Sequence, residues 1–547
     1  TYNGAVTLAA TPITLTTTNS DVSFGSTLNG NAASRALTIA AGTGSVTFTG
    51  AVGGSTALGA TAITAATSTI SSTFVGSSTL GITGNAVING AISGITTLNI
   101  SGTTSVAANV TSSSNQTYTG AVTVTGSAVT LNSSSSNGVV LFSSTVNSAA
   151  SAANPLTVSA GSGNVTLTGA VGGGTNGALG ALTVNTTGTT TFSAAVTAAS
   201  VTTNSGGTTA INGGSVTTTG DQTYNDAVTL GAATTLTSSG SGAINLASTV
   251  NGAQTLTINT AGTTTFGGIV GGTTALTSVT TDAAGTVVIN GGAVTTTGAQ
   301  TYNDAATLGA ATTLSASSIT TGSTMAAGSN AITLTTDAIA LGGNLSSTGA
   351  LIIQPKTATT TIAIGSAATG DLKIDDAELV RLVDGFSSIT IGSTTGTGAI
   401  AVAYTTPYTF TDALTIRSNT SGGGAISATS ALNTGTNALT VTSGGAVAVA
   451  GITSGTLAIT GTGITLNGNI TTTGAQTYTG AITLGDSITL TSNNNTVAFS
   501  GSGTTINGAK AFTVDAGSGA ISFGGVVGGS SVLSSLSLTT THRSEER

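Results

Sequence analysis

Cysteine and tryptophan are absent from this sequence of 547 residues, and charged residues make up only 4% of it, against about 25% in an ordinary globular domain. Without cysteine there is no disulfide framework. With 8 lysines and arginines there is no basic surface for nucleic acid, so we expect no nucleic-acid partner. No apolar run approaches the roughly 18 residues of a membrane-spanning helix, so we expect no membrane insertion.

Ionisable side chains are also too scattered to indicate an enzyme. General acid–base chemistry needs two tuned groups a few ångströms apart, and most charged residues here stand alone. The sequence contains neither the Gly-x-x-x-x-Gly-Lys-Ser/Thr loop of phosphate-binding proteins nor the Gly-Gly-x-Gly-x-Asp repeat that binds calcium. We therefore expect no catalytic residue, no cofactor and no enzymatic activity.

What the sequence does contain is short runs in which apolar and hydroxyl residues alternate. "SVTFTG" places Val46 and Phe48 on one face of a strand, and Thr47 and Thr49 on the other. Glycines, of which there are 80, and asparagines separate these runs. Aromatics are only 3%. The pattern predicts an all-β protein with a thin core of small apolar side chains.

Asn-Gly pairs that follow an apolar residue give the spacing of a repeat. The gaps between them lie close to multiples of about 20 residues, a period that suits one turn of a solenoid. We expect these asparagines to form a structural ladder of stacked turns: Asn29, Asn89, Asn212, Asn251, Asn290, Asn467 and Asn507. Asn-Gly also marks tight β-hairpins, so an antiparallel meander is the alternative fold.

Longer phrases recur as well. Residues 211–236 and 289–314 match at 23 of 26 positions. A strand, a glycine corner and a Gly-Gly pair recur in "GSVTFTGAVGG" at 44–54 and "GAISFGGVVGG" at 519–529. An active site needs no second copy of itself, whereas stacked layers make the same demand repeatedly. The sequence therefore predicts a β-solenoid of parallel strands with about 20 residues per coil and roughly 25 coils.

One segment departs from this texture, because seven charged residues lie between Asp371 and Asp384. "DDAELVRLVDGF" predicts a short helix within 375–385 that Asp375 or Asp376 caps and Gly385 ends. Its inward-facing residues would be Leu379, Val380 and Val383.

The same segment holds the only candidates for a metal site, which are weak because they lack the spacing of a calcium loop. They are Asp375, Asp376, Glu378 and Asp384. The alternative is a solvated helical insert at a corner or module junction. We accordingly divide the chain into solenoid repeats (1–369), a charged insert (370–392), further repeats (393–540) and a charged tail (541–547). The tail contains His542, for which we expect exposure and no chemical role.

The recurring phrases, together with "DAELVRLVDGFSSITIGSTTGTGAIAV" from Asp376 and "YTFTDALTIRS" from Tyr408, resemble the repeat regions of filamentous-haemagglutinin-like exoproteins. These are bacterial proteins of the two-partner-secretion and autotransporter kind. The resemblance implies a right-handed parallel β-helix, export through an outer-membrane β-barrel, and service as an adhesin shaft or surface fibre. Thr1 begins within a repeat phrase, so we expect a mature or excised piece of a longer protein.

We therefore expect a non-enzymatic structural rod at the bacterial cell surface, the shaft of an adhesin or the subunit of a fibre. Its expected partners are further repeats of a parent chain or copies of itself stacked end to end, together with host or cell-surface glycans. A filament that self-assembles through this stacking is the first alternative. A second is ice binding by arrays of Thr-x-Thr, although outward threonine is also simply a good strand residue.

Overall fold

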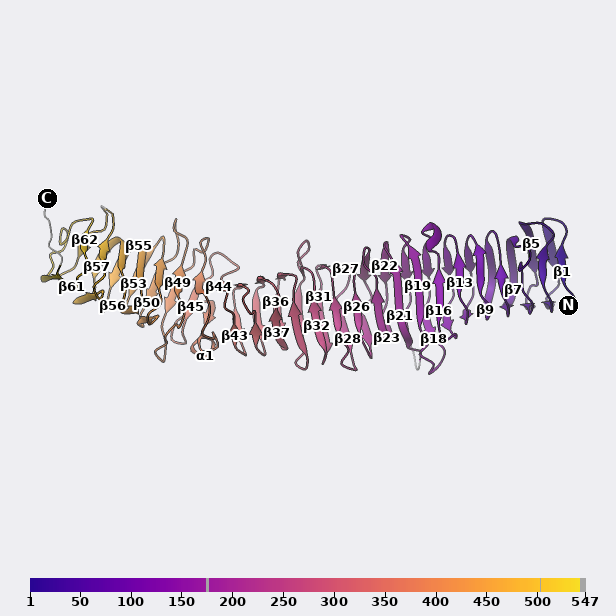
Figure 1. Ribbon diagram of the computed structural model, residues 1–547, viewed down its shortest axis with the longest axis horizontal. Coiled ribbons are helices and arrows are strands. Elements are labelled where there is room, and N and C mark those ends of the chain that lie inside the picture. Colours follow the sequence, from indigo (N-terminus) through magenta and orange to yellow (C-terminus); the bar gives the residue numbers. More distant parts are fainter. Residues whose placement is uncertain (174–176, 502, 542–547) are drawn as a thin grey trace. The chain divides into compact units, whose positions relative to one another are not determined.

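The structure is a computed structural model that describes residues 1–173, 177–501 and 503–541. The chain divides into two compact units, which comprise Thr1–Val287 and Val288–Arg547. Both are built from short strands that stack coil upon coil in parallel, and Figure 1 shows these strands side by side within each unit. Together the units hold about 25 coils, so the predicted β-solenoid is confirmed. Every ladder between described strands is parallel, which rules out the antiparallel meander.

The first unit has three faces, which we call A, B and C, and most coils contribute a strand to each. Where a strand is missing, an isolated bridge takes its place, as at Val52 and Val171. Face A contains β3 (Val22–Phe24), β6 (Val46–Phe48), β7 (Leu58–Ile70, second half), β9 (Leu80–Ile88, second half), β12 (Thr104–Val106), β15 (Val122–Val124), β18 (Val146–Ser148), β23 (Val196–Thr203, first half), β25 (Ser215–Thr218), β28 (Thr234–Ser238), β31 (Thr255–Thr260) and β33 (Ser278–Thr281).

Faces B and C follow in turn along each coil. Face B contains β1 (Val6–Leu8), β4 (Leu28–Gly30), β8 (Phe74–Val75), β10 (Ile92–Ile95), β13 (Val110–Ser112), β16 (Val129–Asn132), β19 (Leu156–Gly161), β21 (Leu179–Thr186), β23 (second half), β26 (Gln222–Tyr224), β29 (Ile244–Leu246) and β32 (Thr263–Phe266). Face C contains β2 (Ile13–Thr16), β5 (Arg35–Ala40), β7 and β9 (first halves), β11 (Leu98–Ile100), β14 (Gln116–Tyr118), β17 (Val140–Phe142), β20 (Val165–Leu167), β22 (Thr189–Phe192), β24 (Thr208–Ile211), β27 (Ala227–Leu230) and β30 (Val250–Asn251).

The second unit also has three faces, which we call D, E and F. Face D contains β35 (Ala293–Thr295), β38 (Thr312–Ser315), β41 (Ile332–Thr335), β44 (Ala350–Gln354), β47 (Ser388–Gly392), β49 (Leu414–Arg417), β52 (Leu439–Thr442), β55 (Leu457–Leu466, first half), β57 (Gln476–Leu484, first half), β59 (Val497–Phe499) and β62 (Ile521–Phe523).

Faces E and F complete the second unit. Face E contains β36 (Ala299–Tyr302), β39 (Ser318–Thr321), β42 (Ile339–Leu341), β46 (Leu372–Ile374), β45 (Ile362–Ile364), β48 (Ile400–Val402), β50 (Ile426–Ala428), β53 (Ala446–Val449), β55 and β57 (second halves) and β60 (Ile506–Asn507). Face F contains β37 (Ala305–Leu308), β40 (Met325–Ala326), β43 (Leu345–Ser346), β51 (Leu432–Asn433), β54 (Ile452–Ser454), β56 (Ile470–Thr472), β58 (Ile488–Thr491), β61 (Ala511–Gly517) and β63 (Ser535–Thr540).

The alternation read from the sequence decides what each strand buries. Val46 and Phe48 are fully buried, whereas Thr47 between them is only half-buried and points outward. The scarce aromatic side chains also lie inside, and several stack on their counterparts in the next coil. The rings of Phe24 and Phe48 are 5.3 Å apart, and those of Tyr118 and Phe142 are 5.2 Å apart. The core is therefore a column of stacked side chains rather than a single cluster.

Glycine occupies the corners that need a positive φ, as expected from the repeated Gly-Gly phrase. The first glycine of the pair has φ of +70° at Gly53, +66° at Gly172, +72° at Gly271 and +74° at Gly528. A Cβ on Gly53 would lie 2.0 Å from the carbonyl oxygen of Val75 in the next coil. Both backbone conformation and space therefore require glycine at this corner.

Next to β44 and β47, face E carries one strand more than face D. On face D, β44 pairs directly with β47. Over the same stretch face E holds two strands, because β45 pairs with β48 on one side and with β46 on the other. The segment 370–392 therefore belongs to the sheets of the second unit, to which it contributes β46 and β47. The division between units falls at Val287, far from this segment.

Candidate functional site

The densest group of charged side chains surrounds the helix α1 (Asp376–Leu379), which is a single turn. Asp375 occupies its N-cap, and the Oδ1 of Asp375 accepts a hydrogen bond of 2.9 Å from the N–H of Glu378. In return the Oε2 of Glu378 accepts one of 3.0 Å from the N–H of Asp375. This capping box satisfies two backbone donors that the helix leaves free. It confirms the helix start and Asp375 as its cap.

Glu378 also reaches a strand end outside the helix. Its Oε1 accepts a hydrogen bond of 3.1 Å from the N–H of Leu341, the last residue of β42. The side chain is 8% exposed, and this burial raises the pKa of its carboxyl, against the effect of the two backbone donors. Because β46 lies beside β42, the carboxylate serves as an acceptor where the additional strand enters face E.

Asp376 joins three segments of the chain. Its Oδ1 accepts a hydrogen bond of 2.8 Å from the N–H of Ser366, and its Oδ2 accepts one of 2.9 Å from the N–H of Thr405. The hydroxyl of Thr405 and the N–H of Thr406 donate to the same Oδ2. Partial burial would raise the pKa of Asp376, but these donors outweigh it and lower the pKa. The carboxylate thus fastens two loops to the start of the helix.

The four residues considered as metal ligands are therefore used differently. Asp375, Asp376 and Glu378 direct their oxygens at backbone N–H groups, and Asp384 is exposed. Among the described residues there is no group of three or more His, Cys, Asp or Glu side chains that could hold a metal ion. The arrangement has the chemistry of a backbone clamp, in which charge-assisted hydrogen bonds fix loops.

The helix is shorter than the sequence indicated, and one of its inward residues was wrongly assigned. It ends at Leu379, and Val380 is 68% exposed, while Leu382 is buried and Val383 is half-buried. The chain leaves the helix to rejoin face F, where the carbonyl of Arg381 accepts from the N–H of Leu345. Gly385, with φ of +127°, follows this bridge and does not end the helix. The hydrogen bonds of the β-ladder, rather than helical periodicity, therefore determine which of these side chains face inward.

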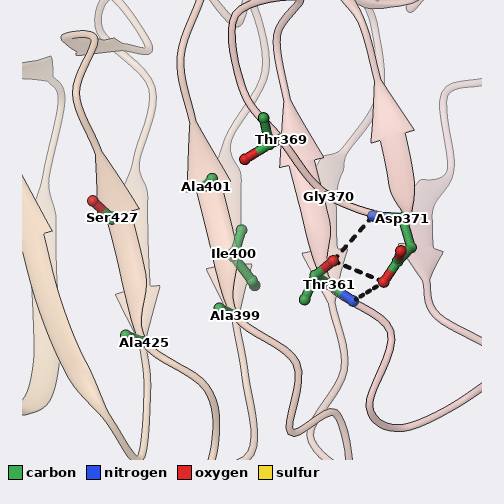
Figure 2. Close-up of a pocket in the computed structure, with 9 residues that line it drawn as sticks. All are labelled: Thr361, Thr369, Gly370, Asp371, Ala399, Ile400, Ala401, Ala425 and Ser427. Atoms are coloured by element: carbon green, nitrogen blue, oxygen red, sulfur yellow. Dashed lines mark hydrogen bonds between the residues drawn. The ribbon is translucent and has the colours of Figure 1, made fainter.

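A shallow surface depression lies beside the additional strand, and Figure 2 shows its lining. The Oδ2 of Asp371 accepts from the hydroxyl and the N–H of Thr361, at 2.8 and 3.2 Å. The N–H of Asp371 donates back to the hydroxyl of Thr361 at 3.0 Å. Apart from Asp371 the lining is uncharged, with small side chains such as Ala401 and Ser427. One carboxylate without a partner base offers no acid–base pair.

Asparagine side chains hold the corners of successive coils, but not by stacking on one another. The Oδ1 of Asn29 accepts from the N–H of Ser55 at 3.0 Å. Asn251 accepts from the N–H of Thr273 at 3.0 Å, and Asn507 accepts from that of Ser530 at 2.9 Å. Other asparagine and aspartate side chains do the same one coil along: Asn19, Asp21, Asn85, Asn109, Asn115, Asn137, Asn164, Asp221, Asn469 and Asn494.

The remaining asparagines of the predicted ladder lie against glycine or at a strand end. A Cβ on Gly231 would lie 2.0 Å from the Oδ1 of Asn212. The same relationship joins Asn290 to Gly309 and Asn467 to Gly485, at 2.1 and 2.0 Å. Asn89 follows β9, and its N–H donates to the carbonyl of Ile70. In this ladder the asparagine side chains other than that of Asn89 therefore contact the backbone of the neighbouring coil, not another asparagine. Asn212, Asn290 and Asn467 each require a glycine in that coil.

The recurring tyrosine phrase also forms a buried polar pair that the strand pattern did not predict. The hydroxyl of Tyr224 donates to the Oε1 of Gln222, and both side chains are fully buried. The Nε2 of Gln222 donates to the carbonyls of Val216 and Thr237 and to the hydroxyl of Thr218. The same Gln-x-Tyr pair recurs as Gln116–Tyr118, Gln300–Tyr302 and Gln476–Tyr478. The constant "QTY" was the available signal.

These pairs do not share one face of the solenoid. Gln116 stacks on Val140, and this column continues along face C as far as Val228. Gln222 stacks on Val201, in the column of face B that begins at Val129. Two of the three faces of the first unit, B and C, therefore accept the same local device.

Comparisons with known proteins add no family to this description, since no protein-family model and no curated protein matches the chain. No helix among the described residues is long and apolar enough to cross a membrane. The charged tail, including His542, lies outside the described residues apart from Thr541.

Proposed function

We propose that this chain is a non-enzymatic section of an extracellular shaft, of the kind that carries a bacterial surface adhesin. The observation that supports the proposal is the fate of its polar side chains. Carboxylates and amides such as those of Asn29, Asp376 and Glu378 bind backbone N–H groups of neighbouring coils or loops. Groups that an enzyme would direct at a substrate are here directed at the backbone.

A shaft must resist extension, and these contacts act along the stacking direction. Parallel ladders, stacked core side chains and asparagine ties all join one coil to the next, so neighbouring coils supply most of each coil's stability. The resemblance of the recurring phrases to filamentous-haemagglutinin-like repeats supports the bacterial surface as the location. Host or cell-surface glycans would bind elsewhere along a parent protein or at its tip.

Single-molecule force spectroscopy tests the mechanical part. We expect the chain to lengthen in steps of about 70 Å, the extended length of one coil of about 20 residues. Extension in one event, at forces that merely straighten an unfolded chain, would contradict the proposal. Antibodies against this region should label intact, unpermeabilised cells of the source bacterium, and labelling only after permeabilisation would contradict the location.

Ice binding is supported less well by the outward threonines. On face B they follow one another at Thr157, Thr183, Thr202 and Thr223, after which Asn245 takes the position. The neighbouring outward column is broken sooner, because Ser159 stacks on Asn185. An ice-like array needs both columns filled coil after coil, which these strands do not provide.

A further inference from the structure

Three Asn-Gly pairs contact the same kind of corner in the following coil. The pairs are Asn29-Gly30, Asn251-Gly252 and Asn507-Gly508. The corners that contact them, in the same order, are "GGST" at 53–56, "GGTT" at 271–274 and "GGSS" at 528–531. The N–H of the first glycine of each corner donates a hydrogen bond of 2.7 Å to the carbonyl of the residue before the asparagine. The recurring asparagine and the recurring Gly-Gly phrase are therefore two halves of one contact.

The following coil holds both residues of each pair. The Oδ1 of Asn251 accepts hydrogen bonds of 3.0 and 3.3 Å from the N–H groups of Thr273 and Thr274. In return the N–H of Gly252 donates to the carbonyl of Thr274 at 3.3 Å. The other two pairs are held in the same way, by Ser55 and Thr56 and by Ser530 and Ser531. The asparagine amide and the glycine nitrogen beside it are thus fixed from one side.

These are the two groups that react when an Asn-Gly pair loses its amide. Because glycine has no side chain to hinder the approach, its backbone nitrogen attacks the Cγ of the preceding asparagine. A bond forms between this nitrogen and Cγ, the bond from Cγ to Nδ2 breaks, and the proton of the attacking nitrogen leaves with ammonia. Water then opens the resulting succinimide at one of its two carbonyls. The product is aspartate or isoaspartate, in which the backbone runs through the side chain.

Stacking of the following coil opposes this reaction. The glycine nitrogen must leave its acceptor and the asparagine side chain must leave its donors before the two can meet, and Gly252 is also buried. The Asn212-Gly213 pair is arranged differently. Asn212 is exposed, and the N–H of Gly213 donates to the carbonyl of Phe192 in the preceding coil at 3.0 Å. Loss of the following coil therefore frees the nitrogen of Gly252 but not that of Gly213.

We propose that Asn29, Asn251 and Asn507 are spontaneous deamidation sites controlled by the following coil. They keep their amides while that coil is stacked and form isoaspartate once it separates. An aspartate product would still fit, because Asp21 and Asp221 accept from backbone N–H groups of the following coil at 2.7 and 2.8 Å. Isoaspartate adds an atom to the backbone and displaces the carboxylate. A coil that has opened is thus marked permanently and stacks less well afterwards.

Ageing of the full chain at neutral pH tests the control, with isoaspartate at each site measured by digestion with a protease of broad specificity and mass spectrometry. We expect isoaspartate at residue 251 to form at least about tenfold more slowly in the folded chain than in denaturant, because several hydrogen bonds must open first. Equal rates in the two conditions would overturn the inference.

Removal of one backbone donor tests the role of the following coil directly. Thr273→Pro lacks the N–H that donates to Asn251, so it should accelerate deamidation there by about two- to tenfold, the factor for one net hydrogen bond. Thr273→Ala keeps this N–H and is the matched control. Ser55→Pro should act on Asn29 in the same way and leave Asn251 unchanged. Equal rates in the proline and alanine variants, or acceleration of both sites alike by either proline, would overturn the inference.

Refolding tests the permanent mark. Chains aged in denaturant should carry isoaspartate at residue 251, and after refolding their amides in 252–281 should exchange faster than those of fresh chains. Asn251→Asp should refold with the protection of the wild type. Equal protection in the aged and Asn251→Asp chains would overturn this part of the inference. Force spectroscopy judges the mechanical proposal separately, because deamidation of resting chains needs no applied force.

Discussion

The hydroxyl of Tyr224 donates a hydrogen bond of 3.0 Å to the amide oxygen of Gln222, and neither side chain has any exposure to solvent. The amide nitrogen of Gln222 in turn donates to Thr237 in the next coil at 2.9 Å. A buried amide that meets all its partners fixes the register of two coils, because a shift would leave polar groups unpaired in the core.

Replacing this amide should therefore loosen the coils locally. We expect Gln222→Leu to lower the free energy of opening around 216–246 by about 1–3 kcal/mol, since the Tyr224 hydroxyl and two carbonyls lose their partner. Amide hydrogen exchange of these peptides measures the effect, which suits a repeat protein better than a single melting temperature. Thr223→Ala, on the outward side of the same strand, is the matched control. Equal protection in both variants would contradict a structural role for Gln222.

The close approach of Asn212 to Gly231 predicts a pair of substitutions that compensate. Gly231→Ala alone should destabilise its coil by about 1–3 kcal/mol, because the new Cβ meets the Oδ1 of Asn212. Adding Asn212→Ala should recover most of the loss, since the next atom, the Cβ of residue 212, lies at 3.5 Å. A double-mutant cycle on local hydrogen exchange measures the coupling. Gly81→Ala, with open space around it, should be nearly neutral.

Glu378 offers a test of the clamp at the additional strand. We expect Glu378→Ala to weaken protection of β42 and β46 by about 1–3 kcal/mol, because the N–H groups of Leu341 and Asp375 lose their acceptor. Val380→Ala removes an exposed side chain two residues further along, at the C-cap of the helix, and should change this protection little. If amide hydrogens of β42 and β46 exchange at the same rate in the two variants, the carboxylate of Glu378 does not hold this strand end.

The buried carboxyl of Asp226 predicts that the stability of its coil depends on pH. Burial raises the pKa of its carboxyl, although the N–H of Gly207 and the hydroxyl of Thr209 donate to it. Stability from this group is thus fully present below its ordinary pKa of 3.8 and is lost as pH rises through the raised value. Asp226→Asn should remove that loss, so the variant gains stability relative to the wild type as pH rises from below 3.8 through the raised pKa of Asp226. Hydrogen exchange of 207–230, corrected for intrinsic rates, checks this, with the exposed Asp486→Asn as control.

Much of this architecture could be predicted from the sequence because it depends on local rules. Alternation identified the inward side of β6, and the Gly-Gly phrase identified the positive φ at Gly53. The contacts between coils could not be predicted in the same way. The acceptor of the Ser55 N–H is Asn29, 26 residues away, and coil length varies, so the pairing depends on a register that no local pattern encodes.

The same limit explains the error at Val380. Helical spacing alone favours this residue for the core, but the bridge from Leu382 to Leu345 requires the chain to leave the helix first. Leu382 then takes the inward place. Long-range ladder bonds determined the side-chain direction, and their partner lies more than thirty residues earlier in the sequence.

That the Gln-x-Tyr pair serves face C at Gln116 and face B at Gln222 bears on how such a gene can lengthen. A duplicated stretch need not span a whole number of coils to be accepted, because a displacement from face C to face B still buries the same glutamine and tyrosine side chains. Unequal recombination then has many permissible breakpoints, and drift in the length of individual turns carries little penalty. Related coils in this kind of protein are therefore better recognised by the recurring phrases at their glycine corners than by a fixed repeat length.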